Sequence, residues 1–147
     1  MSDDTDLRVR HLDTLQATIG RLSQHSFTIR GWTVTVVSAV FALLTTQSGA
    51  SSHVTLLALL PTAIFWGLDA YYLHQERLYR RLYAAAANRL TDPASPDVIP
   101  FDMNTTPFRA TTPSWVRTLV TPTVAAIPVV LTFAILATWM VAVAADR

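Results

Sequence analysis

The residues with the chemistry for catalysis or metal binding lie in one short stretch that contains Asp69, His74 and Glu76. A carboxylate and an imidazole form an acid–base pair or a metal site only if they lie close together. Asp69 and His74 are five positions apart, which places them about 140° apart around a helix, so they do not share a face. The chain has no cysteine, and it has no phosphate-binding loop, zinc-ligand spacing or nucleophile motif. We therefore expect no enzyme, no cofactor and no metal site.

The element that must position these residues is the stretch 56–83, LLALLPTAIFWGLDAYYLHQERLYRRLY. Its first half is apolar, and its second half carries two acidic residues and three arginines. A helix over the whole stretch would be about 42 Å long, which exceeds the roughly 30 Å thickness of a bilayer's hydrocarbon core. We predict a transmembrane helix over residues 53–73 that continues into the cytoplasm as a helical extension over residues 74–90.

Composition indicates an all-α integral membrane protein with a single membrane domain. The chain is 51% hydrophobic and 14% charged, whereas soluble domains carry roughly 25% charged residues. No charge occurs in residues 31–68 or 118–145. We predict three transmembrane segments, over residues 31–48, 53–73 and 118–144, of which the first two form a hairpin because their connection is short. Pro61 and Pro128 are expected to kink the second and third segments.

Residues 3–30 are predicted to form a cytoplasmic amphipathic helix, because Leu12, Leu15, Ile19 and Leu22 recur at helical spacing. This helix packs on the chain's own cytoplasmic elements, forms a short coiled coil between protomers, or inserts at the membrane surface. Residues 91–113 contain five prolines and form a Pro-rich cytoplasmic connector. Its large apolar residues are expected to dock on the cytoplasmic helices: they are Phe101, Met103 and Phe108.

The first transmembrane segment is rich in small and hydroxyl residues, which allow helices to approach closely. Two interpretations remain open for these residues, a seam between helices and the lining of a pore. They are Thr35, Ser38, Ala42 and Thr45.

Polar and aromatic residues gather where the segments are expected to cross the membrane surface. Arg30 is the expected partner of Asp69, and Trp32 an interfacial anchor. Glu76 and Arg80 have the spacing of a favourable ion pair within a helix, while Arg77 and Arg81 are free to face lipid phosphates. We interpret nine residues as a structural juxtamembrane network rather than an active site: Arg30, Trp32, Trp66, Asp69, Tyr72, Glu76, Arg77, Arg80 and Tyr83.

The arginines predict the orientation, because short cytoplasmic segments of membrane proteins are enriched in basic residues. Four arginines precede the first segment, six lie between the second and the third, and the hairpin turn has none. We expect the N-terminus and the connector in the cytoplasm and the C-terminus outside, in a bacterial plasma (inner) membrane. The acidic N-terminal region argues against a cleaved signal peptide, and the arginines beside the span are expected to bind lipid rather than nucleic acid.

The segments GRLSQHSFTIRGWTVTVVSAVFALL, FWGLDAYYLHQERLYRRLY and FDMNTTPF resemble a family of small bacterial membrane proteins. The layout is similar to that of SLATT-like transmembrane effectors of antiphage defence systems. This resemblance implies a non-enzymatic effector that forms a pore or disrupts the membrane in a bacterial defence or stress system, with the matching aromatic and charged residues as a structural signature.

Two classes of function remain open at this point. In the first, the chain is a homo-oligomer in the lipid bilayer that forms a pore. In the second, it is a structural or regulatory subunit that anchors a cytoplasmic partner protein through residues 74–113. Loss of the partner when Tyr79 and Tyr83 are changed to alanine would favour the second class.

Overall fold

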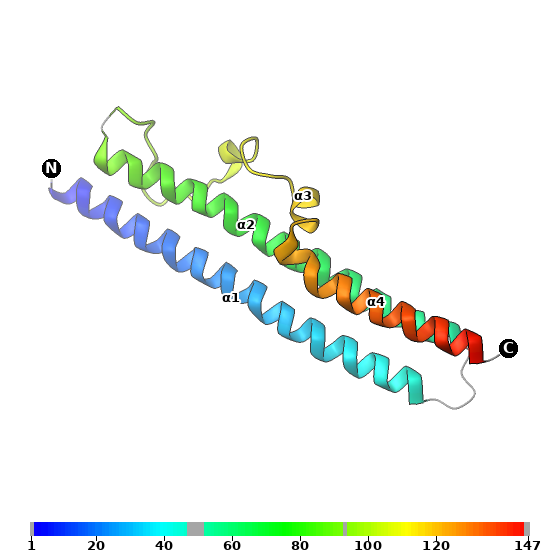
Figure 1. Cartoon of the computed structure of the whole chain (residues 1–147). Helices are drawn as coiled ribbons and strands as arrows, with labels where there is room; N and C mark the ends of the chain where they lie inside the picture. Colours follow the sequence, from blue (N-terminus) through cyan, green and yellow to red (C-terminus); the bar gives the residue numbers. More distant parts are fainter. Residues whose placement is uncertain (1, 47–51, 93, 146–147) are drawn as a thin grey trace.

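The computed structural model describes residues 2–46, 52–92 and 94–145. Within these ranges the chain is all-helical: 84% of the residues are helical and none is in a strand. Helices α1 (Ser2–Thr46) and α2 (Leu59–Thr91) run antiparallel, and α4 (Pro122–Ala145) lies beside one half of α2 (Figure 1). Three helices are long and apolar enough to cross a membrane. The expected fold class is confirmed to this extent.

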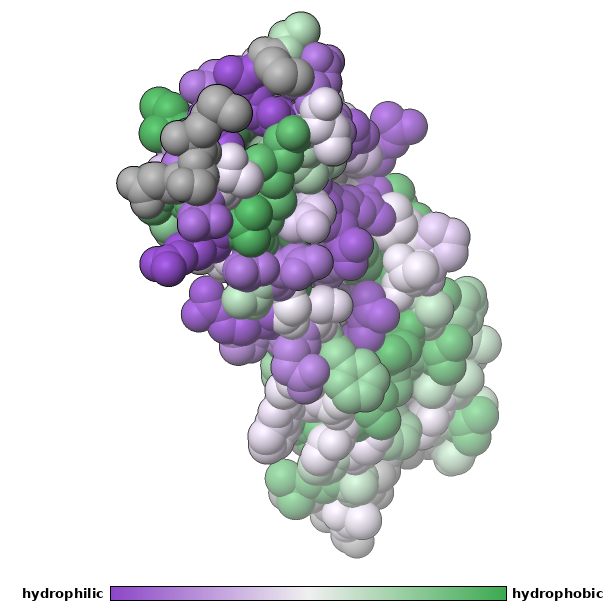
Figure 2. Space-filling model, turned by 90° about the vertical axis from the view of Figure 1, so that its left-hand side faces the viewer, coloured by the Kyte–Doolittle hydropathy of each residue, from purple (hydrophilic) through white to green (hydrophobic). Residues whose placement is uncertain are grey.

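Helices α1 and α2 each join a polar and an apolar region without interruption. With 45 and 33 residues, they are about 68 and 50 Å long, more than a bilayer core requires. We call residues 2–30, 70–92 and 94–114 the polar half of the molecule, and residues 31–46, 52–69 and 115–145 the apolar half. Figure 2 shows hydrophilic residues over one end of the surface and hydrophobic residues over the other. The N-terminal helix and the first span are therefore one helix.

The polar half has its own hydrophobic core. Leu15 of α1 is buried against Leu82 and Ala86 of α2, because the leucine stripe of α1 faces its antiparallel neighbour. Other residues pack around them: Leu12, Tyr79, Tyr83, Val98, Met103 and Phe108. Of the three arrangements expected for the N-terminal helix, packing on the chain's own elements corresponds to these contacts.

A second core lies in the apolar half. Val37 of α1, Ala58 and Ile135 of α4 are buried together. Ala58 belongs to a 3-10 helix, η1 (Ser52–Ala58), that precedes α2. This core is small, and many large apolar side chains of this half are exposed, as they are in a protein surrounded by lipid.

Prolines account for two differences from the expected spans. Pro61 is the third residue of α2 rather than the centre of an α-helical span, so a mid-span kink was the wrong expectation. It lies in the first turn of α2, where backbone N–H groups have no acceptor within the helix, so its missing N–H costs no hydrogen bond. The preceding residues adopt the tighter 3-10 helix. Pro122 is the first residue of α4, so the third span begins there and not at residue 118. Pro128 does lie inside α4.

The connector returns along α2 as an ordered strap. Val98, Met103 and Phe108 pack against the core of the polar half, which confirms the docking expected for the last two. Phe101 is half exposed, and its ring lies edge-on to the His11 ring, with ring centroids 6.0 Å apart. A short 3-10 helix, η2 (Thr106–Phe108), and the five-residue helix α3 (Trp115–Leu119) complete the connection to α4.

Candidate functional site

A buried ion pair joins α1 to α2 where the two halves of the molecule meet. The side chain of Asp69 is 6% exposed, and one of its oxygens accepts a hydrogen bond from Nε of Arg30 at 2.8 Å. The other oxygen accepts a hydrogen bond from the hydroxyl of Ser26. Ser26 and Arg30 are four residues apart, so both donors come from one face of α1. The partnership of Arg30 with Asp69, expected from the sequence, is confirmed.

This ion pair fixes how α1 is aligned along α2. A buried carboxylate is costly unless it is paired and hydrogen-bonded, and here both oxygens of Asp69 have donors. Sliding one helix by a single turn would move the groups about 5.4 Å apart and leave the charges unpaired. The side chain of Arg30 is 32% exposed, so part of its guanidinium stays solvated and the pair is only partly desolvated.

Four hydrogen bonds fasten α3 and Pro113, two residues before it, to α2. The indole of Trp66 donates to the carbonyl of Leu119 at 3.0 Å, and the indole of Trp115 donates to the carbonyl of Gly67 at 3.1 Å. Arg77 donates to the hydroxyl of Thr118. His74 Nδ1 lies 3.0 Å from the carbonyl of Pro113, which only accepts, so Nδ1 carries the proton. The two tryptophans thus reciprocally tie α2 to α3.

Local sequence explains why α3 is short enough to be held in this way. The hydroxyl of Ser114 caps the helix by accepting from the backbone N–H of Arg117. Pro122 cannot continue the helix and starts α4 instead. The last carbonyls of α3 therefore lack partners within their own helix, and one of them receives the Trp66 indole.

The nine residues of the expected juxtamembrane network do not form one network. Glu76 bonds to Arg80 within α2 at 2.7 Å, as expected. The ring of Tyr72 lies against the ring of His25 in α1 at an interplanar angle of 38°, with ring centroids 5.4 Å apart. Tyr83 accepts a long hydrogen bond from Gln16. Trp32 is 56% exposed on α1, away from the ion pair.

The stretch that could have done chemistry is instead divided among separate partners. Asp69 binds α1, His74 binds the connector and Glu76 binds its own helix. Within the described ranges, no three His, Asp or Glu side chains are grouped to hold a metal ion. Asp69 and His74 therefore hold different segments of the chain together, whereas Glu76 pairs within α2.

Sequence analysis missed a buried histidine in the polar half. His11 is 2% exposed, and its Nδ1 accepts from the backbone N–H of Phe101 at 3.0 Å. Burial lowers the pKa of His11 below its usual value of 6.5, although the nearby Asp102 carboxylate acts in the opposite direction. Phe101 has a positive φ of 65°, because it occupies the third position of the turn from Ile99 to Asp102.

One face of α1 in the apolar half carries only small or hydroxyl side chains. Gly31, Thr35, Ser38 and Ala42 are all exposed, whereas Thr33 and Val37 are buried. The side chain of Thr45, expected on the same face, lies outside the described residues. The structure places this face away from α2 and leaves the choice between a seam and a pore lining open.

Other residues of the site differ in whether the sequence contained a signal for them. Ser26 had one, since it lies one turn from Arg30 and shares its face. Thr118 and Leu119 had none, because only the fold of the connector brings them to α2.

No protein-family model matches the chain, and no curated protein and no solved structure matches it.

Proposed function

We propose that the chain is a non-enzymatic protein of the bacterial inner membrane, with its polar half in the cytoplasm and the end of α4 outside. The apolar half would span the bilayer: α4 alone has 24 residues, about 36 Å of helix, enough to cross. Trp32 and Trp66 lie near its boundary with the polar half, and Trp139 of α4 approaches His53 near the other end of the spans. Tryptophans favour both membrane interfaces. We infer the orientation in the membrane from the arginines, because basic residues are enriched in cytoplasmic segments.

We further propose that this protein oligomerises and acts on the membrane as a pore-forming or membrane-disrupting effector. The observation that carries this proposal is the small-residue face of α1 (Gly31, Thr35, Ser38 and Ala42). Exposed positions elsewhere in the apolar half include large apolar side chains suited to lipid, such as Ile64 and Phe133, 62% and 68% exposed, and the exposed alanines of α4, such as Ala134, are interspersed with them. Small and hydroxyl side chains favour close contact with another helix, and a second copy supplies one.

The continuity of α1 and α2 supports a mechanism for such an effector. Both helices pass from the polar half into the apolar half without a break, and the Arg30–Asp69 pair holds their alignment at the boundary. A displacement of the polar half by a cytoplasmic signal would therefore shift the membrane-spanning parts as well. Packed helices change position between discrete arrangements, so the resulting change would be a switch.

A bulky substitution on the small-residue face tests this function. We expect Ser38→Phe to abolish oligomers in nanodiscs and to abolish dye and ion leakage from liposomes, measured with and without the proteins encoded by neighbouring genes. Ala134→Phe is the matched control, because Ala134 is exposed on α4 at membrane depth but lies outside this face. A monomeric wild-type protein, or liposomes that never leak, would refute the proposal.

The second candidate is a structural or regulatory subunit that anchors a cytoplasmic partner protein. It is supported by a cavity of about 430 Å³ between α2 and the connector, whose lining includes Leu82, Val98 and Ile99. Ile99 is 66% exposed, whereas Tyr79 and Tyr83 pack on the core and are unsuitable probes of a partner surface. A co-purifying protein that is lost from Ile99→Asp, with unchanged leakage, would favour this candidate.

A further inference from the structure

An apolar groove opens beside α3, in the part of the molecule closest to the expected membrane surface. Its volume is about 320 Å³. The residues that matter here are Trp66 and Trp115, Ala63 and Gly67 of α2, and Leu119 and Val120. Both indole N–H groups are already bonded to backbone carbonyls, so the groove offers a ligand almost nothing but apolar contact. We call this feature the α3 groove.

Three arginines lie on the polar side of the α3 groove. Arg77 reaches α3 and donates to Thr118 at 3.3 Å, and Arg117 is the neighbour of Thr118 in α3. Arg81 lies one turn beyond Arg77 on the same face of α2. Side chains of a helix lean toward its N-terminus, which in α2 is the end in the apolar half. Arg77 and Arg81 therefore lean toward the α3 groove.

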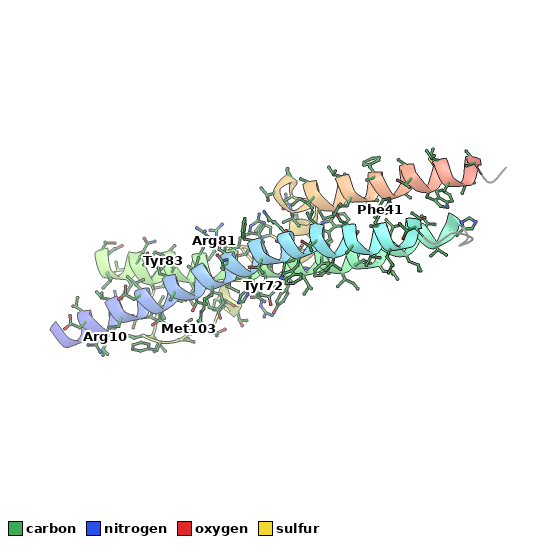
Figure 3. All side chains as sticks on the ribbon, turned by 90° about the horizontal axis from the view of Figure 1, so that it is seen from below. Arg10, Phe41, Tyr72, Arg81, Tyr83 and Met103 are labelled. Atoms are coloured by element: carbon green, nitrogen blue, oxygen red, sulfur yellow. The ribbon has the colours of Figure 1, made fainter. Side chains whose placement is uncertain are left out.

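The charge of these arginines is not neutralised by the chain itself. Arg8, Arg30, Arg80 and Arg89 form ion pairs with carboxylates. Within the described ranges no ion pair involves any of the three arginines beside the groove. The nearest acidic residue along the helix, Glu76, is committed to Arg80. In Figure 3, Arg81 lies on the edge of the molecule occupied by α4, and Met103 of the connector on the opposite edge.

We propose that the α3 groove and Arg77, Arg81 and Arg117 bind one anionic phospholipid of the cytoplasmic leaflet. The phosphate is held by the three guanidinium groups, and an acyl chain occupies the groove. The two features match the two parts of a phospholipid. The arginines attract its anionic phosphate, and the adjacent apolar groove accommodates its hydrocarbon chain. This inference rests on the membrane placement proposed above, but not on pore formation.

Native mass spectrometry in detergent tests the site, with phosphatidylglycerol and phosphatidylcholine of identical acyl chains as probes. We expect the wild-type protein to retain phosphatidylglycerol preferentially. R81Q/R117Q removes two cations whose side chains make no described bond, so the fold is preserved. Each arginine near an anionic headgroup contributes about fivefold in affinity, so the double variant should bind about 25-fold more weakly.

The matched control is R10Q/R109Q, which removes the same charge from two exposed arginines of the polar half, one in α1 and one in the connector. It should change affinity less than about twofold, because screened charges act over roughly 10 Å. Equal losses in the two double variants, or equal retention of the two lipids by the wild type, would overturn the site.

Two further measurements separate a lipid site from a phosphate site. Ala63→Leu fills the α3 groove from an exposed position without changing charge, and it should weaken phosphatidylglycerol retention. Glycerol phosphate, which has the anion but no acyl chain, should fail to displace the lipid. If glycerol phosphate displaces the lipid at equal concentration, or if Ala63→Leu retains as much phosphatidylglycerol as the wild type, the groove does not bind an acyl chain. If the protein binds phosphatidylglycerol specifically but never makes liposomes leak, the proposed pore is refuted and the lipid site is not.

Discussion

Removing the carboxylate of Asp69 should be among the most damaging single substitutions in this chain. In Asp69→Leu, the guanidinium of Arg30 and the hydroxyl of Ser26 lose their acceptor at a buried position. Breaking a buried ion pair typically costs 3–5 kcal/mol. The side chain of Arg30 is 32% exposed, and partial solvation of the orphaned charge reduces the loss. We expect about 2–3 kcal/mol.

The second half of this prediction concerns the double variant. Arg30→Met together with Asp69→Leu removes both charges and leaves apolar side chains of similar length. Replacing a whole buried pair in this way is often close to neutral, so the double variant should recover at least about half of the loss. The coupling in a double-mutant cycle also contains the cost of Arg30→Met alone, so it should exceed the roughly 1–1.5 kcal/mol that the double variant recovers.

Reversible unfolding in mixed micelles, followed by helical circular dichroism, measures these free energies. Glu76→Gln is the control: Glu76 is equally buried, but its partner Arg80 is 62% exposed and on the same helix, so its loss should stay below about 1 kcal/mol. If Asp69→Leu and Glu76→Gln cost the same, or the double variant is no better than the single one, the ion pair does not fix the alignment of α1 and α2.

Three further predictions concern the connector, α3 and the core of the polar half. Since burial holds the pKa of His11 below 6.5, the protein binds more protons at His11 when the connector is released than when it is docked. The free energy of docking of the connector should therefore be constant above about pH 6.5, and docking should weaken as the pH falls toward the pKa of His11 in the docked state. The rate of proteolysis of residues 94–114 at pH 5 and 7.5 measures this. Trp66→Phe removes one hydrogen bond, should cost about 1 kcal/mol, and should speed hydrogen exchange in residues 115–121. Leu15→Ala deletes a fully buried side chain and should cost about 2–5 kcal/mol in the micelle assay.

Each of these predictions has a control. His11→Gln should make proteolysis of the connector independent of pH between 5 and 7.5, and an unchanged pH dependence in that variant would assign it to another group. Exchange in α1 should not respond to Trp66→Phe; a uniform increase would indicate general destabilisation instead. Leu7→Ala, at a 40% exposed position of the same helix, should cost less than about 1 kcal/mol. Equal costs for the two leucines would refute the assignment of the core.

The sequence alone determined the features that depend on composition and local spacing. The absence of charge in residues 31–68 and 118–145 predicts apolar helices. In lipid, backbone N–H and C=O groups must be hydrogen-bonded within the segment, and a helix does this. The leucine stripe around Leu15 predicts a helix buried on one face, and the spacing of Glu76 and Arg80 predicts their pairing. Arg30 could be assigned to Asp69 because a short hairpin brings the ends of two antiparallel segments together.

Only the tertiary structure decided which distant residues meet. The hydrogen bond of Trp66 to Leu119, the bond of Arg77 to Thr118 and the burial of His11 all depend on the path of the connector, and a Pro-rich segment has no periodicity from which a path can be read. The positions of Pro61 and Pro122 within their helices were likewise set by where η1 and α3 end. The α3 groove has the same origin, since its two walls come from segments nearly 50 residues apart. Contacts between segments so distant in sequence are fixed by packing and not by local pattern.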